Sequence, residues 1–189
     1  LALLYENGQG VVQSDEKAVE LYTMSAERGN VSAMFNLGNG YRDGKGVEKS
    51  FKKAAELYTM AADQGQVNAM YDLAIFYQDG KGVAQSFEKA AELFTMSAEQ
   101  GHVSAMNSLG RVYETGRGVV RSFKRAAELY TMAIEQGHAN AMFNLGCLYQ
   151  AGQGVSQSFE KAAELYTMAV EQGHATAMCG LGILYDQGE

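Results

Sequence analysis

One block of sequence returns every 36 residues, and it constrains what this chain can fold into more than any other feature. A serine opens each copy, and the copies that begin at Ser50 and Ser86 are identical at 20 of 36 positions. The other copies open at Ser14, Ser122 and Ser158, so no insertion interrupts the period. A fixed period of this length predicts a solenoid of stacked units. We therefore expect residues 1–189 to form a single solenoid of about five units, as a fragment of a longer array.

Each copy predicts two helices joined by a glycine turn. In the first copy a helix over 14–28 precedes Gly29, and a second helix over 31–43 ends at Gly44. Serine suits the N-cap and glycine suits the left-handed residue after a helix. Small and large apolar residues fall on one arc of each helix, and no stretch alternates with a strand period. The predicted fold class is all-α, with eleven helices, of which the first, over 1–7, is incomplete.

Composition excludes several classes of function. A net charge of −7 argues against a nucleic-acid partner, which would require clustered Lys and Arg. No apolar run approaches the length of a membrane span, so no membrane partner is expected. Cys147 and Cys179 occupy different positions in the repeat and predict no disulfide framework. Two free thiols are compatible with a reducing, cytoplasmic compartment.

The residues that repeat resemble those of a known family. The pattern is Ala69-x-x-x-Leu73-x-x-x-Tyr77-x-x-Gly80-x-Gly82-Val83-x-x-Ser86-x-x-Lys89-Ala90-x-x-Leu93-Phe94-x-x-Ser97-Ala98-x-x-Gly101. This is similar to the Sel1-like repeat, a relative of the tetratricopeptide repeat, and the likeness covers nearly the whole chain. The resemblance implies a right-handed α-α superhelix of helix pairs. It also implies an adaptor that assembles protein complexes, with the Ala-x-x-x-Leu-Gly-x-x-Tyr helix lining the concave side.

The chain departs from the family pattern at three places. Serine stands at Ser50 and its equivalents where the family often has Asp, which changes the helix cap and not the fold. Methionine stands at Met60 and its equivalents where Lys is usual. The disulfides of the cysteine-rich bacterial subgroup have no counterpart here.

A second stripe remains on the second helix of each copy once the core arc is removed. Core positions barely change between copies, whereas stripe positions change freely, and the aromatic residues among them are expected to be exposed. Aromatic rings, amides and single charges suit an extended peptide or a partner helix. We call these residues the predicted binding stripe: Phe35, Asn36, Asn39, Arg42, Tyr71, Asp72, Ile75, Gln78, Asn107, Arg111, Glu114, Phe143, Asn144 and Gln150. The alternative is that they are solvent-facing residues that vary because nothing restrains them.

All ten methionines fall in two positions of the repeat. One set, represented by Met34, belongs to the core arc. The other lies at the outer edge of its helix: Met24, Met60, Met96, Met132 and Met168. This second set either forms an adaptable apolar ridge for a partner or packs along the seam between repeats.

Catalysis and cofactors are not expected. His102, His138 and His174 lie one repeat apart, which is roughly 8–10 Å, whereas the ligands of one metal ion converge within about 2 Å. They therefore cap the helices that follow and form no metal site. The Gly-x-Gly-Val loop lacks the strand and the fuller glycine pattern of a phosphate-binding loop. No catalytic group can be assembled, so we expect a protein that is not an enzyme and that binds no cofactor.

The most probable function from sequence is a scaffold that binds a peptide or partner protein in its concave groove. A different class of function is a spacer that self-associates end to end. Leu1, Leu3 and Leu4 begin in the middle of a repeat, and no following helix would cover Ile183 and Leu184. Solenoids normally seal such ends with polar caps.

The core assignment predicts a large effect of leucine truncation. Leu73→Ala or Leu109→Ala should each lower the free energy of unfolding by roughly 2–5 kcal/mol, as for other buried leucines. Thermal or urea melts measure the loss. A melting temperature unchanged by either substitution would show that the core arc is misassigned.

Overall fold

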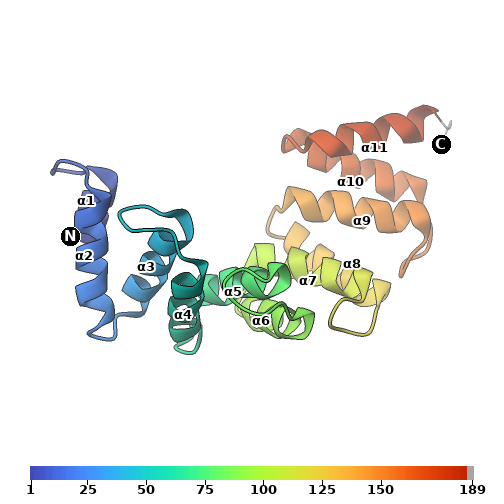
Figure 1. Cartoon of the computed structure of the whole chain (residues 1–189). Helices are drawn as coiled ribbons and strands as arrows, with labels where there is room; N and C mark the ends of the chain where they lie inside the picture. The colour runs from blue at the N-terminus through green and yellow to red at the C-terminus, as the bar shows by residue number, and fades with distance from the viewer. Residues whose placement is uncertain (187–189) are drawn as a thin grey trace. The chain divides into compact units, whose positions relative to one another are not determined.

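The computed structural model describes residues 1–186, and all regular structure within them is α-helical (Figure 1). This confirms the all-α prediction and its eleven helices. The helices are α1 (Ala2–Asn7), α2 (Asp15–Ala26), α3 (Val31–Asp43), α4 (Phe51–Ala62), α5 (Val67–Asp79), α6 (Phe87–Glu99), α7 (Val103–Thr115), α8 (Phe123–Ile134), α9 (Ala139–Ala151), α10 (Phe159–Glu171) and α11 (Ala175–Asp186).

Capping residues set the ends of the first helix in each repeat. Ser14 accepts a hydrogen bond from the Lys17 amide at 3.2 Å, and its four equivalents cap their helices in the same way. Helix α2 ends at Ala26, two residues earlier than expected. Gly29 takes φ +85°, and the Asn30 amide donates to the Ser25 carbonyl, so the chain turns before the helix can continue.

The second helix of each repeat is capped by the side chain that follows the glycine turn. Asn30 and Gln66 accept from backbone amides in the first two turns. His102, His138 and His174 do the same through Nδ1, which accepts at 3.1–3.3 Å from the amide three residues ahead. The predicted capping role of the histidines is confirmed.

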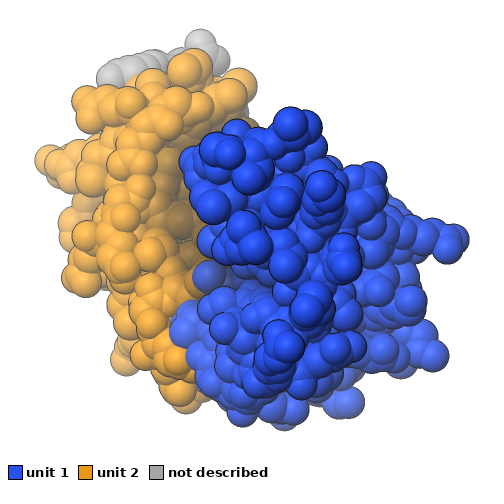
Figure 2. Space-filling view, turned by 90° about the vertical axis from the view of Figure 1, so that its left-hand side faces the viewer, with its two compact units in different colours: residues 1–97 blue, residues 98–189 orange. Residues whose placement is uncertain are grey.

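The chain divides into two compact units, residues 1–97 and 98–189 (Figure 2). In the first unit α3 packs between α2 and α4, and α4 also packs on α5. In the second unit α9 packs between α8 and α10. Both units therefore stack helices in chain order, as the repeat predicts. The expectation of one uninterrupted solenoid cut from a longer array stays a prediction.

The core is built from the residues that repeat. Leu73 and Leu109 are buried, as expected, together with small alanines that let neighbouring helices approach. Met34 and its next three equivalents are also buried. The segment 30 residues further along packs on Met34, since the side chain of Gln64, just after α4, contacts the Met34 sulfur.

Two core predictions at the end of the chain need correction. Met178 was expected in the core but is 54% exposed, since no described helix lies over it. Leu184 was expected to be uncovered but is 1% exposed, because it packs in the cluster around Tyr166. The side chain of Ile183 and residue Gly188 lie outside the described part.

The second glycine of the Gly-x-Gly-Val loop lies against the start of an earlier helix. A Cβ on Gly46 would come 2.2 Å from the Asp15 carbonyl oxygen, and one on Gly82 would come 2.2 Å from that of Phe51. Both residues also have positive φ. The loop is therefore closed by backbone packing, and Val83 packs on the core beside it. Its structural role is confirmed.

Two other features bear on function. None of the described helices is long and apolar enough to cross a lipid bilayer. Both cysteines are free; Cys147 is half-buried, whereas Cys179 is exposed.

The histidine caps predict a pH dependence of stability. Burial lowers the pKa of His102 and His138, so the neutral rings accept hydrogen bonds. Because the unfolded chain binds protons more readily, the stabilisation is complete above the ordinary histidine pKa and is lost as the pH falls through the lowered values. Replacing both residues by Asn, the cap already used at position 30, should remove this loss. Urea melts between about pH 7.5 and pH 5 should show wild type losing about 1 kcal/mol per cap relative to the variant; parallel profiles would contradict the prediction.

Candidate protein-interaction surface

The structure places the predicted binding stripe on α3, α5, α7 and α9, where most of it is half-buried. Of its fourteen residues only Arg111 is exposed, and Asn107 is buried. Most stripe residues are therefore part of the packing of the repeats, which their variation between repeats does not indicate.

The aromatic residues of the stripe pack on rings from the following helix. The ring centroids of Phe35 and Tyr58 are 5.8 Å apart, and those of Tyr71 and Phe94 are 5.7 Å apart. Phe143 and Tyr166 form the same pair in the second unit at 5.6 Å. The expectation that these rings are exposed is wrong, because the buried ring of the next helix offers each of them a stacking partner.

Polar stripe residues accept hydrogen bonds from buried tyrosine hydroxyls. Tyr58 donates to Asn39 Oδ1 at 2.7 Å, and Tyr130 donates to Glu114 Oε2 at 2.7 Å. A buried hydroxyl without an acceptor costs about 1–3 kcal/mol, so each of these tyrosines needs a polar partner, either 16 or 19 residues before it.

Two more repeats follow the same rule. Tyr166 donates to Gln150 Oε1 at 2.8 Å and also contacts the Cys147 sulfur at 3.4 Å. Tyr22 donates to Glu6 at 2.6 Å. The acceptors lie 16 or 19 residues before their tyrosine, which places them one helix away in the stack.

One repeat replaces the whole arrangement by an apolar one. The buried ring there is Phe94, and the residue 19 positions earlier is Ile75, which is half-buried. A phenylalanine has no hydroxyl to satisfy, so an isoleucine can take the place of the amide or thiol found in other repeats. At this position Asn39 and Cys147 contact tyrosine hydroxyls, whereas Tyr22 and Tyr130 pair with acids 16 residues earlier instead.

Burial sets the protonation of these groups. It raises the pKa of Tyr130 well above the ordinary tyrosine value, and the Glu114 carboxylate adds to the rise. Burial likewise raises the pKa of the Cys147 thiol. Both groups are therefore protonated at neutral pH, and the tyrosine acts as a permanent donor.

Charged and amide residues of the stripe also link successive repeats. Arg42 donates to Asp43 at 2.8 Å and reaches Asp72 of the next repeat at 3.1 Å. Burial raises the pKa of Asp72, which the single contact with Arg42 does not offset, since the guanidinium is shared with Asp43. In the second unit the Asn144 amide donates to Asn107 Oδ1 at 3.0 Å.

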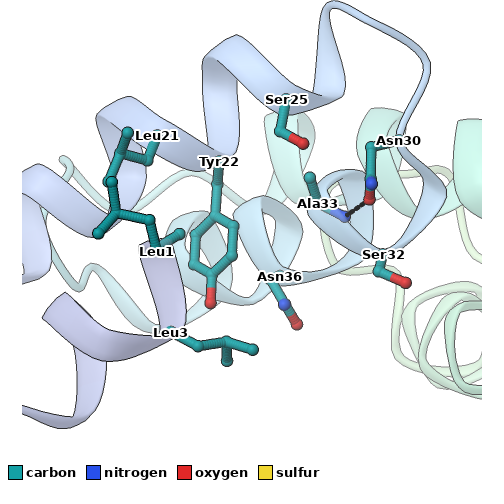
Figure 3. Close-up of a pocket in the computed structure, with 10 residues that line it drawn as sticks. Leu1, Leu3, Leu21, Tyr22, Ser25, Asn30, Ser32, Ala33 and Asn36 are labelled. Atoms are coloured by element: carbon teal, nitrogen blue, oxygen red, sulfur yellow. Dashed lines mark hydrogen bonds between the residues drawn. The ribbon is translucent and has the colours of Figure 1, made fainter. Parts of the chain in front are cut away.

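The remaining stripe residues are less engaged. Gln78 makes a long contact of 3.4 Å with Asp79. Arg111 makes no ion pair in the described part of the chain. Asn36 lines a cavity of about 350 Å³ between α1, α2 and α3, together with Tyr22 and Leu3 (Figure 3).

Sequence reasoning missed two repeated contacts. The tyrosine hydroxyl pairs could have been found by comparing positions 39, 75 and 147 with the ring 19 residues later. A cation also lies over a tyrosine ring in every repeat, as Lys53 lies 4.9 Å from the Tyr41 centroid. Tyrosine and a cation recur twelve residues apart in all copies, which is the signal for this contact.

No group of three or more His, Cys, Asp or Glu residues that could hold a metal ion occurs among the described residues. The histidines are used as caps. What the surface offers is hydrogen-bonding and stacking, which are means of binding.

The tyrosine pairs predict a strong coupling between two residues. Glu114→Ala should lower the free energy of unfolding by about 1–3 kcal/mol, because the Tyr130 hydroxyl loses its acceptor. Adding Tyr130→Phe should restore part of the loss, giving a coupling of about 1 kcal/mol in a double-mutant cycle. Gln78→Ala is the matched control, since this glutamine belongs to the repeat with Phe94 and has no hydroxyl to pair. Equal costs for Glu114→Ala and Gln78→Ala would refute the assignment.

Comparison with known proteins agrees with this geometry. Two solved structures are close in fold over nearly the whole chain. A protective antigen of uropathogenic Escherichia coli matches with a TM-score of 0.93 and 33% identity, over 99% of this chain and 40% of its own. A Sel1 repeat protein of Oxalobacter formigenes matches with a TM-score of 0.91 and 30% identity, over 100% and 75%. The chain thus spans well under two thirds of the Escherichia coli protein's length.

An immunity protein of Pseudomonas aeruginosa is more distant, with a TM-score of 0.57 and 28% identity over 93% of this chain and 67% of its own. Among curated proteins none matches significantly. The Sel1 repeat family model matches five consecutive segments: 1–30, 31–66, 67–102, 103–138 and 139–174. With helix-pair repeats of the same length and neighbours of the same solenoid fold, the chain belongs to the Sel1 repeat family.

Proposed function

We propose that this chain is a scaffold that binds a segment of a partner protein along the predicted binding stripe. Sel1 repeat proteins are generally protein-interaction scaffolds, and they are typically not enzymes.

Arg111 is the observation that carries the proposal. It is the one exposed residue of the stripe, and its guanidinium makes no ion pair within residues 1–186. Arg42 in an earlier repeat is instead held by two aspartates. A guanidinium presents a fork of donors that matches a carboxylate, so a segment with an acidic side chain fits beside it.

Neighbouring stripe residues supply the remaining specificity. Asn144 and Asn107 pair with each other, yet amides can also bind a peptide backbone as donors and acceptors. In the first unit the half-buried rings of Phe35 and Tyr71 keep an open edge for apolar side chains. A surface that changes from repeat to repeat suits a partner segment of definite sequence.

Selection of peptides tests the proposal. Peptides selected from a random library on the purified chain should carry an acidic residue, and Arg111→Glu should weaken them about tenfold or more by turning an attraction into a repulsion. Lys124→Glu is the matched control, because it makes the same charge change at an exposed cation in the same unit, outside the stripe.

The outcomes differ clearly. Peptides that lose affinity with Arg111→Glu and Asn144→Ala but not with Lys124→Glu support binding at the stripe. Equal losses in all three variants, or selected peptides insensitive to all, would place binding elsewhere on the chain.

End-to-end self-association is the second candidate, because large apolar side chains are exposed on the terminal helices. Leu1 is 73% exposed, Leu3 is 55% exposed, and Met178 is 54% exposed. Light scattering over a range of concentrations separates the two functions. A monomer favours the scaffold, whereas growing linear oligomers favour self-association.

A further inference from the structure

A set of exposed methionines recurs at one position of the repeat, on the helices that do not carry the predicted binding stripe. Each of its members is 41–49% exposed: Met24, Met60, Met96, Met132 and Met168. From the sequence, these methionines could either form an apolar ridge for a partner or pack along the seam between repeats. In the structure nearly half of each residue is exposed to solvent. In the first unit α2, α4 and α6 each contribute one. Methionine is a flexible, polarizable side chain that adapts to varied apolar partners.

Two carboxylates accompany each methionine. One lies four residues before it and the other three residues after it, so at 100° per residue both fall on the same side of the methionine. All ten are exposed: Glu20, Glu27, Glu56, Asp63, Glu92, Glu99, Glu128, Glu135, Glu164 and Glu171. None of them forms an ion pair in the described chain. We call the methionines with these acids the methionine–acid strip.

The strip is constant where other exposed positions vary. The exposed residue at position 16 alternates in sign, from Glu16 to Lys52 to Glu88. The exposed residue at position 12 runs from Val12 through Glu48 onward without a fixed chemical type. Solvent exposure alone therefore leaves a position free to change in this chain, while the strip keeps its three residues in every repeat.

The strip has two acids for each repeated cation. The cation lies three residues before the first acid and ten residues before the second, which is about 15 Å along the helix. The cations are also held over tyrosine rings, as Lys17 is over Tyr5 at 5.3 Å and Lys89 is over Tyr77 at 5.1 Å. The strip therefore places a net negative charge beside its methionines.

We propose that the methionine–acid strip of the first unit, on α2, α4 and α6, is a second docking surface, which binds a basic amphipathic helix of a partner protein. The apolar face of such a helix covers the methionines, and its Lys and Arg residues meet the carboxylates. Charge selects this occupant, because the same acids repel nucleic acid and anionic lipid. The strip has the same residue types in every repeat, so it recognises the spacing of apolar and basic residues in its partner and not a unique sequence. The proposal is independent of binding at the stripe.

Methyl NMR of the full chain labelled at methionine tests the proposal. The probe is an 18-residue amphipathic Leu/Lys peptide, and the controls are a shuffled peptide of the same composition and a Leu/Glu counterpart. The Leu/Lys peptide should shift the methyl signals of the strip methionines. The four buried methionines are internal controls and should not move: Met34, Met70, Met106 and Met142.

Matched variants separate the apolar and the charged contributions. Met24→Gln/Met60→Gln/Met96→Gln and Glu20→Gln/Glu56→Gln/Glu92→Gln should each weaken the peptide about tenfold, as expected for three lost contacts of this kind. Val12→Gln/Val120→Gln and Glu16→Gln/Glu48→Gln/Glu88→Gln change exposed residues outside the strip and should leave the affinity unchanged. Raising the salt concentration should weaken binding.

Several results would overturn the proposal. They are no detectable binding, equal binding of the shuffled or Leu/Glu peptide, methyl shifts confined to other methionines, or equal effects of the strip and control variants. Since the stripe variant Arg111→Glu should not change this affinity, a failure here leaves binding at the stripe to be judged on its own experiment.

Discussion

In three repeats the packing of a tyrosine ring against a helical glycine is the contact on which the rest of the unit depends. The repeat with Phe94 has Ala74 in the place of the glycine. A Cβ on Gly38 would lie 2.6 Å from the Tyr58 ring, and one on Gly110 would lie 2.4 Å from Tyr130. No side chain fits in these places, so the glycine fixes how closely the two helices approach. The ring is then fully buried, and its hydroxyl emerges at the neighbouring helix, where it must find an acceptor.

The need for a hydroxyl acceptor also constrains residues of the surface that we propose binds partners. Asn39 and Glu114 are variable between repeats, yet each pairs with a tyrosine hydroxyl. The residue type at these positions therefore depends on an internal contact as well as on any partner that binds there. Exposed residues such as Arg111 can change type without disturbing the packing of the fold. A scaffold built in this way can change its specificity only at a few positions without losing stability.

Sequence reasoning succeeded where the causes are local. Serine caps, the histidine caps at His102 and its equivalents, and the glycine turns depend on residues within four positions, and the structure confirms all of them. It failed where a contact joins residues 16 to 30 positions apart. The stacking of Phe35 on Tyr58 and the exposure of Met178 depend on which helix of a neighbouring repeat lies alongside, and helical periodicity alone does not contain that information.

The two faces of the repeat therefore carry different kinds of information. Tyr71 and Asp72 on one helix differ from their counterparts in every other repeat, and such a face can discriminate between partner sequences. On the other helix, Met60 and Glu56 recur unchanged in every repeat. Such a face can recognise only the spacing and the charge of a partner. One surface is suited to choosing a partner and the other to holding a repetitive basic helix. Because they lie on different helices of each pair, substitution of one leaves the contacts of the other in place.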